Sequence, residues 1–122
     1  MINILLVGLG AGIGGALRYF VANSMQRLFP SAFPIGTLTV NFLGSLILGL
    51  LIFGLDDKGL LSANWRMILA VGFCGGFTTF STFSFETFAL LQDAEFFIAT
   101  INIFLNLFTT ILAVALAYML TR

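Results

Sequence analysis

The chain has 122 residues, of which 60% are apolar and only 8% are charged. A soluble domain carries about 25% charged residues, so this chain could not cover a water-facing surface, and its solvent must be lipid. Five basic residues balance five acidic ones, which argues against a nucleic-acid partner and a polybasic lipid-binding tail. With no histidine and one cysteine, Cys74, the chain offers neither an internal disulfide nor a cysteine-based metal site.

Apolar runs separated by short polar breaks predict an all-α membrane protein, with one domain over residues 1–122 and four transmembrane helices. The first helix is predicted over residues 3–28 as a retained segment, because no basic residue precedes it as in a signal peptide. Pro30 ends it. The other helices are expected over residues 36–54, over residues 66–92, and from residue 96 to the C-terminus.

The basic residues give only a weak indication of orientation. An even number of crossings puts both termini on one side, together with Lys58, Arg66 and Arg122, and leaves Arg27 on the other side. The positive-inside rule then favours cytoplasmic termini. A chain that inserts in both orientations would show such a small charge bias. We therefore hypothesise that this chain has dual topology.

Glycines recur at helical spacing in the first predicted helix, where Gly8 pairs with Gly12 and Gly10 with Gly14. Small residues spaced by four let two helix backbones approach closely. The sequence leaves two readings open, packing against neighbouring helices of the same chain and contact with a second copy.

Polar residues spaced by four form one stripe on the second predicted helix and another on the fourth. These stripes are Thr37, Asn41 and Ser45, and Asn102, Asn106 and Thr110. They could line a wet track, or they could join the helices by hydrogen bonds of about 0.6–2 kcal/mol each. Both readings remain open at this stage.

The third predicted helix contains a double glycine, Gly75-Gly76, in the middle of the membrane. We expect the helix to break near Gly75–Thr79, and such breaks form ion sites in transporters. Beyond the break, Phe80, Phe83, Ser84 and Thr87 share a helical face. The positive edges of aromatic rings, with an amide such as Asn41, could bind a small anion weakly enough to release it. Against this, most phenylalanines of such an apolar chain would simply contact lipid or core.

Two charged residues fall within the predicted membrane segments. Arg18 could snorkel to the interface or could lend a positive field to an anion vestibule. Glu86 could carry protons, accept a hydrogen bond from a neighbouring helix, or pair with a hydroxyl. The parts of an enzyme are missing, because the chain has no histidine, no phosphate-cradling motif and no carboxylate cluster.

One run in the third helix resembles the signature of the Fluc (CrcB-type) fluoride channel family. The run is Gly75-Gly76-Phe77-Thr78-Thr79-Phe80-Ser81-Thr82-Phe83-Ser84, followed by Glu86. Residues 14–19 and 36–41 match the family as well, in its order and at its spacing. The resemblance covers nearly the whole chain.

The resemblance implies an antiparallel, dual-topology homodimer in the plasma or inner membrane, with lipid around it and no other protein partner. Two pores, each built from both subunits, would let fluoride leave the cytoplasm passively. By position the pore residues would be Asn41, Phe80, Phe83, Ser81, Thr82, Ser84, Thr37, Asn106, Thr110 and Glu86. Arg18 would lie in the vestibule, and the backbone carbonyls of Gly75 and Thr78 would bind a structural Na⁺ at the dimer centre.

Two other functions remain as alternatives. A proton-coupled small multidrug or cation exporter would have a similar size and could also have dual topology, although such a protein uses an essential acid on its first helix. Here the only membrane acid is Glu86, on the third helix. The other alternative is a nontransporting membrane partner or assembly subunit.

Overall fold

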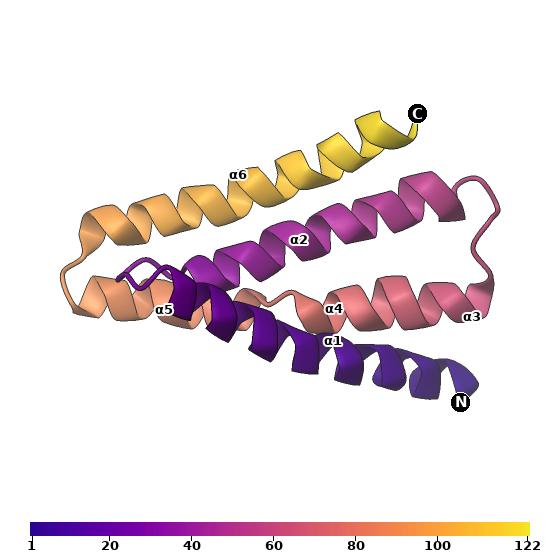
Figure 1. The fold of residues 1–122 in the computed structure, drawn as a ribbon, viewed down its shortest axis with the longest axis horizontal. Helices are drawn as coiled ribbons and strands as arrows, with labels where there is room; N and C mark the ends of the chain where they lie inside the picture. Colours follow the sequence, from indigo (N-terminus) through magenta and orange to yellow (C-terminus); the bar gives the residue numbers. More distant parts are fainter.

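The computed structural model describes residues 1–122 and contains four helices that are long and apolar enough to cross a membrane (Figure 1). The first is α1, Ile2–Leu28, and the last is α6, Phe96–Thr121. The second crossing is α2, Ile35–Leu51, which continues as a wider π-type helix over Ile52–Asp56. The all-helical fold with four crossings is therefore as predicted.

The third crossing is assembled from several segments between Ala63 and Gln92. It begins with α3, Ala63–Trp65, and a π-type segment, Arg66–Cys74, and continues as α4, Gly75–Phe77, and α5, Phe80–Gln92. Between α4 and α5 the backbone is extended for two residues. Their dihedral angles are φ −93° and ψ 159° at Thr78, and φ −150° and ψ 121° at Thr79.

The double glycine is not where the backbone leaves the helix. Gly75 has helical angles, φ −63° and ψ −38°, and the interruption falls on the two threonines that follow. Gly76 serves close packing instead, because a Cβ atom there would lie 2.5 Å from the carbonyl oxygen of Ala11 on α1. The interruption therefore lies at the last two residues of the predicted range, Gly75–Thr79, and not at the double glycine itself.

The α1 glycines divide into two faces. A Cβ on Gly10 or Gly14 would collide with the backbone of the π-type segment, at the carbonyls of Ile68 and Phe73. A Cβ on Gly8 or Gly12 would meet nothing within 4 Å. The Gly10–Gly14 pair therefore packs within the chain, whereas the Gly8–Gly12 pair faces outward.

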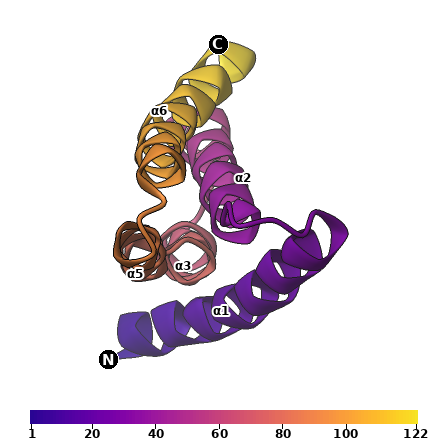
Figure 2. The ribbon, with the colours of Figure 1, turned by 90° about the vertical axis from the view of Figure 1, so that its left-hand side faces the viewer.

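Figure 2 shows how the helices are arranged around the third crossing. Helix α1 packs along the π-type segment and α4, α2 packs between α1 and α6, and α5 packs against α6. Both termini lie at the same end as the α2–α3 connection (Figure 1), as an even number of crossings requires. The α1–α2 and α5–α6 connections lie at the opposite end.

The chain buries polar side chains and exposes large apolar ones. Five polar residues are buried: Thr37, Asn41, Thr87, Asn102 and Asn106. Exposed apolar side chains run along the whole of α1 and α6. This is the arrangement expected in lipid, where a polar group needs a partner inside the protein.

Candidate functional site

Asn41 of α2 pairs with the backbone where the third crossing is interrupted. Its Oδ1 accepts from the Thr79 N–H at 2.8 Å, and its Nδ2 donates to the Thr79 carbonyl at 3.2 Å. In a continuous helix, the Thr79 N–H would bond to the Gly75 carbonyl, four residues earlier. The amide of Asn41 therefore replaces a peptide group and satisfies a backbone that would otherwise be unpaired inside the membrane.

A chain of hydrogen bonds continues from Asn41 across the bundle. The Nδ2 of Asn41 also donates to Oδ1 of Asn106, 2.9 Å away on α6. Asn106 donates to Oδ1 of Asn102 at 2.9 Å, and Asn102 donates to the Thr87 hydroxyl at 2.9 Å. This amide chain joins α2, α6 and α5, so the interhelical hydrogen bonds expected of the polar stripes are present.

Arg18 reaches the other side of the interruption. Its Nε donates to the Gly76 carbonyl at 2.9 Å, an oxygen that would accept from the N–H of residue 80 in an unbroken helix. The guanidinium is therefore directed into the bundle beside α4. This contact favours the alternative in which Arg18 lends its positive field to an anion vestibule.

The N-terminus of α5 begins at the interruption. Thr79 caps it, because its hydroxyl accepts from the Thr82 N–H at 3.1 Å. The first N–H groups of a helix have no partner within the helix and carry partial positive charge. The start of α5 therefore offers a favourable environment for an anion.

A cavity of about 200 Å³ opens beside this helix start, and we call it the Asn41 cavity. Its lining residues come from α2, the interruption, α5 and α6: Asn41, Ser45, Thr78, Thr79, Phe80, Phe83, Asn106, Leu107 and Thr110. The rings of Phe80 and Phe83 meet edge to face, with centroids 5.4 Å apart. The cavity therefore brings together five of the residues predicted for the pore, Asn41, Phe80, Phe83, Asn106 and Thr110.

A second cavity, of about 230 Å³, gathers most of the other predicted residues, and we call it the Arg18 cavity. Arg18, Thr37, Thr82 and Glu86 line it, together with Thr79. Because Thr79 borders both cavities, the two spaces adjoin at the interruption of the third crossing.

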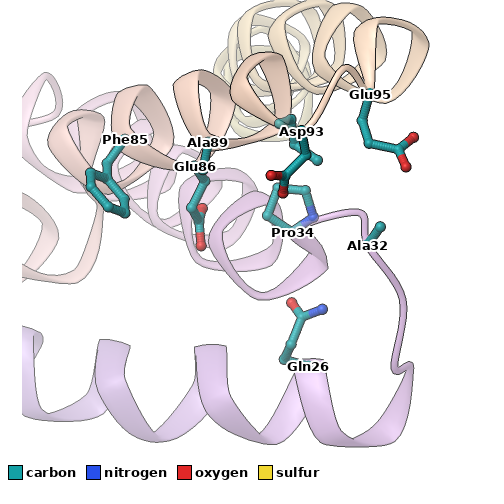
Figure 3. Close-up of a pocket in the computed structure, with 9 residues that line it drawn as sticks. Gln26, Ala32, Pro34, Phe85, Glu86, Ala89, Asp93 and Glu95 are labelled. Atoms are coloured by element: carbon teal, nitrogen blue, oxygen red, sulfur yellow. The ribbon is translucent and has the colours of Figure 1, made fainter.

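A third cavity, of about 400 Å³, lies toward the α1–α2 connection, and we call it the Gln26 cavity. Figure 3 shows Glu86 and Asp93 pointing from the α5 side toward Gln26 on α1. Glu95 also lines this space, and no basic residue does. Glu86 borders the Arg18 cavity as well, and its Oε1 is buried with no hydrogen-bond partner.

Two predicted pore residues lie outside the Asn41 and Arg18 cavities. Ser81 is exposed, with its hydroxyl 3.4 Å from that of Thr79. Ser84 lines an apolar groove between α5 and α6, together with Phe80 and Phe83. Conversely, Thr79 was not predicted as a site residue, although its backbone and hydroxyl organise the interruption. Its place between the predicted Thr78 and Phe80 was the only signal in the sequence.

Two backbone carbonyls at the interruption have no donor. No hydrogen bond of the chain reaches the carbonyl oxygen of Gly75 or of Thr78. A Cβ on Gly75 would meet nothing within 4 Å, so this residue lies on an open surface of the single chain.

Comparison with known proteins gives relatives over nearly the full length. A family model described as "CrcB-like protein, Camphor Resistance (CrcB)" matches residues 5–118. A protein of Coxiella burnetii named "Fluoride-specific ion channel FluC" is 48% identical over 107 residues, which cover 85% of each chain. A protein of the same name from Pyrococcus abyssi is 43% identical over 122 residues, 97% of this chain and 94% of the relative.

A third relative, "Fluoride-specific ion channel FluC 3" of Methanosarcina barkeri, is 42% identical over 116 residues, 95% of this chain and 87% of the relative. The family resemblance of the third crossing is thus matched by similarity along the whole chain. The chain belongs to the CrcB family.

Proposed function

We propose that this multi-pass membrane protein is a fluoride-selective passive channel that lets fluoride leave the cytoplasm. The observation that carries the proposal is the Asn41 cavity, where an amide, two phenylalanine rings and a helix N-terminus meet beside an interrupted transmembrane helix. Relatives that match most of the chain are named fluoride-specific ion channels.

The chemistry of the cavity suits a small, strongly hydrated anion. Ring edges, amide N–H groups and hydroxyls all present partial positive charge, so they can replace part of the hydration shell. None of them carries a full charge that would trap the ion, and conduction requires an ion to leave as readily as it arrives. The larger chloride ion fits this narrow path less well.

The Arg18 and Asn41 cavities, which share Thr79, would together form the route of the anion. Arg18 places its guanidinium beside the Arg18 cavity and attracts anions toward the interruption. Thr37, Thr82 and Thr79 then provide hydroxyls along the way to Asn41. A membrane potential contributes about 2.3 kcal/mol per charge per 100 mV, so a negative cell interior drives fluoride outward without a pump.

The working unit is an antiparallel homodimer in the plasma or inner membrane. In a single chain Phe80 is 73% exposed although it borders the Asn41 cavity. A second copy would cover this ring and complete the pore wall. The outward Gly8–Gly12 face of α1 offers a further surface for close helix contact.

The unpartnered carbonyls of Gly75 and Thr78 fit a sodium ion at the dimer centre. Carbonyl oxygens freed at a helix break are suitable ligands for Na⁺. One chain offers two such oxygens, and a symmetric partner would offer two more. The ion would hold the two interrupted crossings together, while the residues of the Asn41 cavity bind the anion.

The alternative function, a proton-coupled exporter, has less support. Apart from Asp56 at the end of the second crossing, Glu86 is the only acid within the crossings, and it lies on α5 beside Arg18 and Thr37. No relative described above is named as an exporter.

The direct test is efflux from liposomes that contain the purified protein and potassium fluoride. After valinomycin is added, a fluoride electrode should record rapid release, and a chloride electrode should record negligible release from matched potassium chloride liposomes. If a folded dimer releases neither anion, the channel proposal is wrong. Uptake of a cationic dye driven by a proton gradient, and lost in Glu86→Gln, would favour the exporter instead.

A further inference from the structure

The amide chain has a fixed direction, because groups that cannot reverse hold both of its ends. At one end the Thr79 backbone N–H can only donate, so it fixes the oxygen of Asn41 and turns Nδ2 toward Asn106. At the other end the Thr87 hydroxyl donates its proton to the Phe83 carbonyl. This hydroxyl must therefore accept from Nδ2 of Asn102.

The orientation of Asn106 follows from these two ends. Its Oδ1 accepts from Asn41, and its Nδ2 donates to the backbone carbonyl of Asn102 at 3.0 Å and to Oδ1 of Asn102 at 2.9 Å. Both N–H groups of Asn106 are thus committed to Asn102. Asn106 borders the Asn41 cavity but has no free donor to offer there.

Asn102 cannot act by touching the ion. It is 0% exposed and borders neither the Asn41 cavity nor the Arg18 cavity. It lies one helical turn before Asn106 on α6 and holds the amide of that residue through two acceptors. A role in transport would have to be exerted through Asn106.

We propose that Asn102 is a positioning residue that keeps the N–H groups of Asn106 away from the anion path and so keeps anion binding weak. This inference rests on the proposed channel function. If the side chain of Asn102 no longer accepts, one N–H of Asn106 loses its partner and the amide can rotate. An anion could then bridge the NH₂ groups of Asn41 and Asn106, and it would bind more tightly and leave more slowly.

The test is the single-channel fluoride current in planar bilayers, measured over a range of fluoride concentrations. We expect Asn102→Leu to lower the half-saturating fluoride concentration by about threefold to twentyfold, the range that one interhelical hydrogen bond in a membrane is worth. The maximal current should fall as well, because release slows.

Two further variants separate this effect from a general loss of packing. Thr87→Val keeps the shape of the side chain but removes the acceptor for Asn102, so the half-saturating concentration should fall in the same direction by a smaller factor. Thr100→Val is the matched control, because this α6 hydroxyl bonds only to the Phe96 carbonyl of its own helix. It should leave both parameters at their wild-type values.

An Asn102 that serves only as packing would give a different result. Asn102→Leu would then reduce thermal stability and the number of active channels but leave the half-saturating fluoride concentration unchanged. An unchanged or a higher half-saturating concentration in this variant would overturn the inference. If Asn102→Leu does not fold, Thr87→Val decides the question, and an unshifted half-saturating concentration refutes the inference. A wild-type protein that passes no fluoride refutes the proposed function and this inference together.

Discussion

Asn41 both pairs with the interrupted backbone and borders the cavity that we assign to the anion. Its two N–H groups are committed to the Thr79 carbonyl and to Asn106, so an arriving anion must compete with protein acceptors. Such competition keeps binding reversible. The same residue therefore contributes to the fold of the third crossing and to the strength with which an anion is held.

Replacing Asn41 with aspartate should reduce both fluoride transport and stability. The carboxylate of Asn41→Asp can still accept from the Thr79 N–H, but it leaves the Thr79 carbonyl and Oδ1 of Asn106 without a donor, at a stability cost of about 1–3 kcal/mol each. Its negative charge repels fluoride, so flux should fall by at least about tenfold, the effect of about 1.4 kcal/mol. Fluoride efflux and thermal unfolding measure the two effects. Asn64→Asp, at an exposed position on α3, is the control, and equal flux in both variants would contradict the assignment.

Phe80 allows transport to be separated from stability. Its ring is 73% exposed in the single chain, so Phe80→Ile removes little packing within a subunit. It does remove the ring edge from the Asn41 cavity, and we expect fluoride flux to fall by about tenfold or more. Phe97→Ile, at a ring that is 78% exposed on α6, should keep wild-type flux in the same efflux assay. Undiminished flux in a folded Phe80→Ile protein would remove Phe80 from the pore.

The sequence indicated which residues lie at the site better than it indicated which hydrogen bonds they make there. The polar stripes and the run from Gly75 to Glu86 pointed to most of the residues that line the Asn41 and Arg18 cavities. The pairing of Asn41 with the Thr79 backbone could not be predicted, because it depends on how α2 approaches an interruption whose position was not yet known. The inward orientation of Arg18 could not be predicted either, because it depends on the Gly76 carbonyl, which the interruption leaves without a backbone donor.

The four helices follow from hydropathy alone, because a lipid core of about 30 Å requires about 20 apolar residues for each crossing. The predicted ends differ from the observed ones by at most three residues, and those at Leu28, Gln92 and Phe96 coincide with them. The π-type segments at Ile52–Asp56 and Arg66–Cys74 were not predicted, since no residue pattern distinguishes them from an α-helix. Within the predicted range Gly75–Thr79, the sequence does not indicate that the interruption falls on the threonines, because glycine is found both at helix breaks and where helices pack closely, as Gly76 does.

The two faces of α1 give a matched test of helix packing. In Gly14→Ala the new methyl group meets the Phe73 carbonyl, and overpacking of this kind costs about 1–3 kcal/mol. In Gly12→Ala the methyl group meets nothing within 4 Å of the single chain, and alanine favours the helix by about 1 kcal/mol. Thermal unfolding in detergent should show a lower Tm for Gly14→Ala only. A lower Tm for Gly12→Ala would indicate that the outward face also contacts a neighbour.

At the scale of the whole molecule, the single chain leaves the Phe80 ring and the Gly8–Gly12 pair facing outward and two carbonyls without a donor. The antiparallel dimer that we propose would account for all of these features. The weak charge bias between the two ends of the chain suits such a dimer. If the C-terminus carries a tag, the tag should be found on both sides of the membrane in cells, whereas a single side would exclude dual topology.

Removal of sodium should weaken the assembly if the Gly75 and Thr78 carbonyls bind this ion at the dimer centre. A ligand present at about 100 times its Kd stabilises the folded state by about 2.7 kcal/mol. The Tm of the dimer should therefore fall when N-methyl-D-glucamine replaces sodium at equal chloride concentration, and it should recover when sodium is restored. A Tm that is independent of sodium would exclude the ion.

The reversal potential in a planar bilayer tests the central claim most directly. The two sides contain a tenfold gradient of fluoride and equal chloride, with an impermeant cation throughout. A fluoride-selective channel predicts a reversal potential of about 59 mV in magnitude, the equilibrium value for a singly charged ion in a tenfold gradient. A reversal potential at zero would mean that the current follows chloride, and it would contradict the account.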